Sequence, residues 1–73
     1  MKRYTNKPTD IVARGAGGFW KHLQYPEVLP EWLRDNIVNS LLKRYPQRIA
    51  TIEVRQYGKL VDFFHTNLNE NGN

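Results

Sequence analysis

Residues 30–46 constrain the fold of this chain more than any other stretch. Leu33, Ile37 and Leu41 recur at four-residue spacing between two prolines, which is the pattern of a helix that lays one face on a core. Proline suits the start of a helix and cannot continue one. Acidic residues near the start and basic residues near the end also suit the helix macrodipole. We therefore predict an amphipathic helix from Pro30 to Arg44.

A β-hairpin is predicted directly after this helix. The segments Ile49–Arg55 and Leu60–His65 are rich in β-branched and aromatic residues, as strands are. Gly58, in the turn between them, can adopt the positive φ that a tight turn needs. The register that pairs Arg55 with Leu60 is favoured because it sets apolar residues opposite one another on one face.

This register gives the hairpin two different faces. The face expected to pack on the helix holds three cross-strand pairs: Val54–Val61, Ile52–Phe63 and Ala50–His65. The opposite face is unusually apolar for the exposed side of a sheet, and it holds Ile49, Thr51, Leu60 and Phe64. Such a surface is expected to bind a partner, to pair in a homodimer or to be covered by the N-terminal segment.

The stretch before the helix is predicted as strand, turn and strand. Residues 11–13 read as a short strand, residues 14–18 as a glycine-rich turn and residues 19–24 as a second strand. The prediction is therefore a small α+β domain of ββαββ type, with one amphipathic helix on a short antiparallel sheet. The alternative is a winged-helix-like unit, in which Phe19–Tyr25 is a short helix and Ile49–His65 is the wing.

The chain is predicted to hold one domain between two flexible ends. Residues 1–9 are polar and basic, and Pro8 disfavours a helix through them. Residues 67–73 contain four asparagines and a glycine, a composition that cannot compensate its ordering entropy. Residues 10–66 are therefore taken as the domain, residues 1–9 as a basic arm and residues 67–73 as a disordered tail.

Several functional classes find no support in the composition. There is no cysteine, so disulfides and thiolate metal sites are excluded, and His22 and His65 stand far apart in the sequence. No catalytic motif surrounds Ser40 or any carboxylate, so no enzyme activity and no cofactor are expected. No stretch has the length and apolar character of a membrane span or a signal peptide. The expected location is the cytoplasm.

Positive charge is concentrated at the start of the chain. The net charge of +4 comes entirely from residues 1–25, which also hold a glycine cluster and an aromatic pair. Cations interleaved with aromatics are suited to phosphates and bases. We expect a small nucleic-acid-binding accessory or regulatory protein. The residues expected to contact nucleic acid are Lys2, Arg3, Lys7, Arg14, Trp20, Lys21, Arg44 and Arg48.

The alternative function is a protein-interaction module, an adaptor or inhibitor that docks on a larger partner. Trp32 lies off the apolar stripe of the predicted helix, and a tryptophan on a polar helix face is a candidate hot spot. The apolar outer face of the hairpin, with Ile49, Leu60 and Phe64, is the second candidate contact. The small size and the absence of catalytic groups are also typical of accessory proteins that phages and mobile elements encode.

Overall fold

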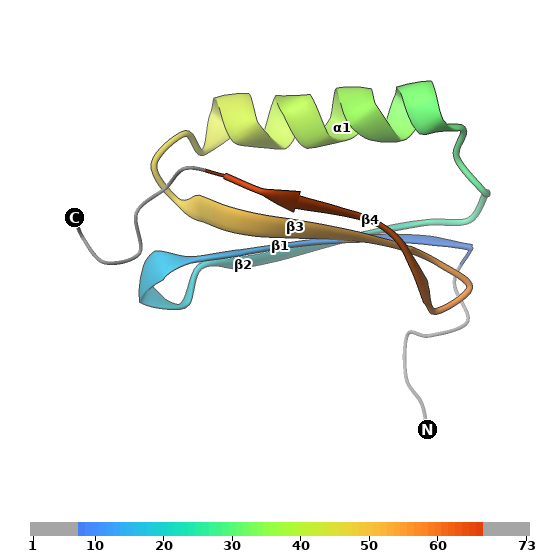
Figure 1. Ribbon diagram of the computed structural model, residues 1–73, viewed down its shortest axis with the longest axis horizontal. Coiled ribbons are helices and arrows are strands. Elements are labelled where there is room, and N and C mark those ends of the chain that lie inside the picture. Colours follow the sequence, from blue (N-terminus) through green and yellow to red (C-terminus); the bar gives the residue numbers. More distant parts are fainter. Residues whose placement is uncertain (1–7, 67–73) are drawn as a thin grey trace.

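The computed structural model describes residues 8–66, in which one helix lies across one face of a four-stranded sheet (Figure 1). The elements are β1 (Thr9–Gly15), the short 3₁₀ turn η1 (Ala16–Gly18), β2 (Trp20–Tyr25), α1 (Glu31–Arg44), β3 (Ile49–Gln56) and β4 (Lys59–His65). The strand order is β2-β1-β3-β4, and all neighbours are antiparallel. The predicted α+β class and ββαββ order are confirmed. The segment that the winged-helix alternative made a short helix is strand β2.

The core lies between α1 and the two central strands. β1 and β3 pair with each other, and each also pairs with the outer strand of its own hairpin. The buried apolar side chains that form this core cluster come from these two strands and from α1, and they are Ile11, Ala13, Val38, Leu41, Ile49, Ile52 and Val54. The helix stripe predicted from the sequence therefore meets the predicted sheet.

A buried threonine connects the start of β1 to the start of the helix. The Thr9 hydroxyl donates to the carbonyl of Glu27 at 2.7 Å and accepts from the backbone N–H of Leu29 at 3.2 Å. Pro30 takes the N-cap position, and α1 begins one residue later than predicted. Because Thr9 is wholly buried and lies in β1, the domain includes the last residue that was assigned to the arm. Residues 1–7 and 67–73 lie outside the described residues.

The predicted hairpin register is correct only at its turn end. Arg55 pairs with Leu60 as expected, but Val54 then pairs with Asp62, because a bulge leaves Val61 without a partner. One extra residue in a strand reverses the side that each later residue faces. A second irregularity, between Arg14 and Gly15 of β1, skips Ala50 and turns Ile49 to the side of Ile52.

The two bulges reverse the faces that were predicted for several hairpin residues. Ile49 is buried in the core and Phe64 packs against it, so neither forms the exposed outer surface that was predicted. Phe63 and Val61, expected to face the helix, are exposed, as is His65. Leu60 is exposed as predicted.

This register predicts opposite outcomes for two truncations. Ile52→Ala removes a side chain with 0% exposure and should lower the free energy of unfolding by about 2–5 kcal/mol. Phe63→Ala removes a side chain that is 51% exposed and should cost less than about 1 kcal/mol. Urea unfolding followed by circular dichroism gives both values. Equal, large losses of unfolding free energy at the two positions would contradict the bulge and support the predicted register without it.

Candidate nucleic-acid interface

The connections at one end of the sheet bring together basic residues from distant parts of the chain. The η1 turn and the α1–β3 connection both lie at this end (Figure 1). β2 begins here with Trp20 and Lys21, α1 ends here with Arg44, and Arg48 precedes β3. We call Lys21, Arg44, Arg48 and the rings of Phe19 and Tyr45 the basic end.

The three cations of the basic end surround two packed rings. Phe19 and Tyr45 lie with their centroids 5.0 Å apart. Lys21 Nζ and the Arg44 guanidinium are 5.6 Å and 5.9 Å from the Tyr45 centroid, and the Arg48 guanidinium is 5.1 Å from that of Phe19. These distances are within the range of cation–π attraction. The rings therefore hold three mutually repelling charges at one place.

No carboxylate neutralises this cluster within residues 8–66. The ion pairs of the described chain are Arg14–Glu53, Arg55–Glu53 and His22–Asp10. The macrodipole of α1 accounts for a cation at its last residue, Arg44. It does not account for Lys21, which is on β2, or for Arg48, which follows the helix.

A close backbone approach fixes Arg48 beside the η1 turn. A Cβ atom on Gly15 would lie 1.6 Å from the carbonyl oxygen of Arg48, so no side chain fits at residue 15. Gly17 and Gly18 have φ of 68° and 80° and face open space. Glycine is required at Gly15 by contact and at the other two by conformation.

Alanine substitution at Gly15 and Gly17 should distinguish the effect of close contact from the effect of a positive φ. Gly15→Ala is expected to lower the free energy of unfolding by about 3 kcal/mol or more, because the backbone at Arg48 must move away. Gly17→Ala, which meets no atom, is expected to cost about 1 kcal/mol for its positive φ. Thermal unfolding of both variants measures the difference. A smaller loss of stability for Gly15→Ala than for Gly17→Ala would show that the end of β1 does not contact the backbone at Arg48.

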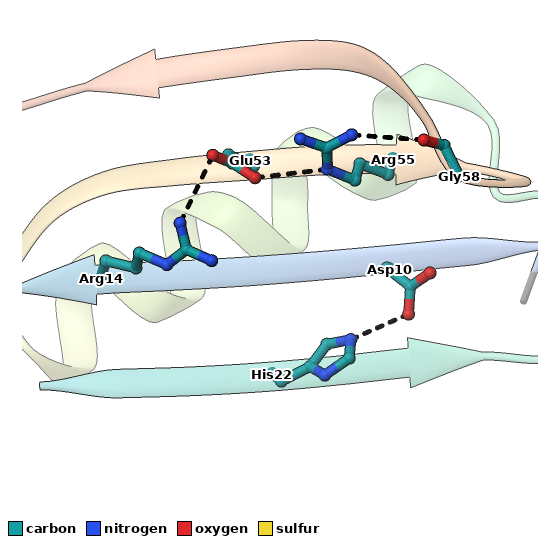
Figure 2. A network of polar contacts seen from close by, with 6 residues as sticks. All are labelled: Asp10, Arg14, His22, Glu53, Arg55 and Gly58. Carbon is teal, nitrogen blue, oxygen red and sulfur yellow. Dashed lines mark hydrogen bonds and ion pairs between the residues drawn. The ribbon is translucent and has the colours of Figure 1, made fainter. Parts of the chain in front are cut away.

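The sheet face opposite α1 carries a polar network next to the basic end. Figure 2 shows Glu53 between two arginines: Arg14 Nη1 lies 3.6 Å from Glu53 Oε2, and Arg55 Nε lies 3.3 Å from Glu53 Oε1. Arg55 also donates to the carbonyl of Gly58 at 3.2 Å. Arg14 is therefore partly neutralised, unlike the three cations of the basic end.

A buried carboxylate on this same face orients an exposed tryptophan. Asp10, only 1% exposed, lies 2.8 Å from His22 Nε2 (Figure 2) and accepts from the Gln24 amide at 3.0 Å. The His22 ring meets the Trp20 ring edge to face, with centroids 5.6 Å apart. Trp20 is 55% exposed. Its ring is thus held in place while one surface stays open, as a stacking platform requires.

A groove of about 450 Å³ separates β2 from α1. The side chains of Lys21, Leu23 and Tyr25 line it from the strand. The helix contributes apolar Ile37 and Leu41 and polar Asn36 and Ser40, and Arg44 and Tyr45 complete the lining at the basic end. β2 is the outer strand on this side of the sheet, so the groove is open along it.

The structure brings three of the eight residues expected to contact nucleic acid into one cluster and places two more at the same end of the sheet, on the face opposite α1. Lys21, Arg44 and Arg48 are in the basic end, and Arg14 pairs with Trp20 across the strands directly beside it. The other three, Lys2, Arg3 and Lys7, lie outside the described residues. Trp32, at the start of α1, and Leu60, on the far strand β4, are not part of this group.

The paired rings, the groove and the Asp10–His22 contact were not expected from the sequence. No motif marks them, because each joins residues from separate elements. Within residues 8–66 no three metal-ligating side chains gather. None of the described helices has the length and apolar character to cross a membrane. No family model, curated protein or solved structure matched the chain.

Proposed function

We propose that this protein binds nucleic acid, with Lys21, Arg44 and Arg48 contacting phosphates. The observation that supports this function is that three cations converge on one aromatic pair and none of them forms an ion pair with a carboxylate of residues 8–66. Phosphates are the counterions that such a cluster lacks, and releasing their condensed cations drives binding.

Trp20 adds a contact of a different kind. Its ring lies on β2 at the same end of the sheet as the basic end but on the face opposite α1, where it contacts His22, so it can stack on a base on that face while the basic end contacts phosphates of the same strand. Stacking accepts any base. The proposed activity is therefore binding with little sequence preference and without catalysis.

Charge removal at the basic end tests the phosphate contacts. The variant Lys21→Gln/Arg48→Gln should reduce the slope of log affinity against log salt by about 2, one unit for each phosphate that the protein no longer neutralises. The control Lys43→Gln/Lys59→Gln removes the same charge from two exposed lysines outside the basic end. This control should retain most of the wild-type slope of log affinity against log salt. Fluorescence anisotropy with a labelled oligonucleotide measures both. Equal slopes in the two variants would disprove phosphate contact at the basic end.

The two tryptophans provide a matched test of stacking. Trp20→Ala should weaken binding to single strands by roughly 1–3 kcal/mol. Trp32→Ala removes a ring that is 65% exposed at the other end of α1 and should leave the affinity unchanged. Titrations of both variants at one salt concentration make the comparison. If only Trp32→Ala weakened binding, the contact surface would lie at the start of the helix.

A second candidate function is docking on a larger protein through the outer strand β4. Leu60, Val61 and Phe63 of this strand are 50%, 43% and 51% exposed, and Tyr57 in the adjoining turn is 63% exposed. Exposed apolar side chains on an edge strand favour a protein contact. An oligonucleotide titration that stays flat at low salt would favour this function over the first.

A further inference from the structure

The groove between β2 and α1 has one charged end and one uncharged end. Lys21 and Arg44 lie at the basic end, each within 6 Å of the Tyr45 ring centroid. Tyr25 is four residues further along β2, about 13 Å away, and Asn36 is eight residues earlier in α1, about 12 Å away. Because β2 and α1 run in opposite directions (Figure 1), Tyr25 and Asn36 both line the uncharged end of the groove.

The groove walls between the two ends are suited to a flat, partly polar ligand group. Leu23, Ile37 and Leu41 provide apolar surface, while Asn36 and Ser40 provide hydrogen-bond donors and acceptors. Among residues 8–66 no carboxylate lines the groove. The volume of about 450 Å³ is within the range of small-ligand sites.

We infer that this groove holds one unstacked nucleobase of a single strand, with its phosphate at Lys21 and Arg44. The inference rests on the proposed function and names its substrate class. A nucleotide has one anionic end, a flat ring and an edge of donors and acceptors, and the groove presents a partner for each of the three. An acidic peptide would match the charge, but it would leave the separate uncharged end unexplained.

A base in the groove requires a strand whose bases are free. In a duplex the bases are stacked inside, and extruding one requires breaking its stacking and pairing. The groove therefore adds affinity for single strands, whereas the three cations of the basic end act on any phosphate backbone. The protein should consequently bind single-stranded DNA or RNA more tightly than a duplex with the same number of phosphates.

Narrowing the groove tests this inference. Ser40 is exposed and lines the groove, so Ser40→Leu should fill part of it without disturbing the core. We expect about tenfold weaker binding of a labelled single-stranded oligonucleotide, as for removal of one stacked base. Duplex binding, which rests on phosphates, should change by less than about twofold. The control Asn39→Leu alters the adjacent exposed residue, which does not line the groove, and should change neither affinity. Circular dichroism confirms that both variants are folded.

The possible outcomes separate the two proposals. If single strands and duplexes bind equally, or if Ser40→Leu leaves the single-strand affinity unchanged, the base-binding groove is disproved. The proposed function still stands in that case, provided that Lys21→Gln/Arg48→Gln flattens the salt dependence. If no oligonucleotide binds at about 50 mM salt, both proposals fail. A poly-glutamate peptide that binds in place of the oligonucleotide, and less tightly to Ser40→Leu, would make the groove a site for acidic protein segments.

Discussion

The pairing of β1 with β3 is the interaction on which the rest of the structure depends. Each of these strands forms a hairpin with its sequence neighbour, and such a hairpin is at best marginally stable alone in water. Their antiparallel pairing joins the two hairpins into one sheet and places Ile11 beside Val54 and Ala13 beside Ile52. α1 then covers this central pair. In a chain with no disulfide, that shared apolar layer is the main source of stability.

The same pairing also builds the candidate functional site. Gly15 ends β1 against the carbonyl of Arg48, so the η1 turn and the α1–β3 connection are held together. Phe19 and Tyr45 then pack across this junction, and their rings gather the cations. The sheet therefore fixes the backbone that carries the basic end, and its charges lie close together before any ligand arrives, which reduces the entropy cost of binding.

The two bulges show where local patterns lose their predictive value. If side chains alternated strictly between the two sheet faces from the turn onward, Phe63 would point toward the helix and Phe64 outward. In the structure one unpaired residue, Val61, reverses both orientations. The sequence 60–65 contains apolar residues at odd and even positions alike, so neither register was excluded by its hydrophobic pattern. Packing against Ile52 and the helix decided between them. Ile49 was misplaced for the same reason, by the bulge at Ala50.

The sequence by itself determined the elements: the helix between two prolines, the two hairpins around their glycines, and the α+β order that results. These features depend on local propensity and on the spacing of apolar residues. Only the tertiary structure decided which face each hairpin residue takes, and that Lys21, Arg44 and Arg48 meet at one end. The physical reason is that both outcomes depend on contacts between residues far apart in the chain, where strand pairing and close packing, rather than local pattern, determine the geometry.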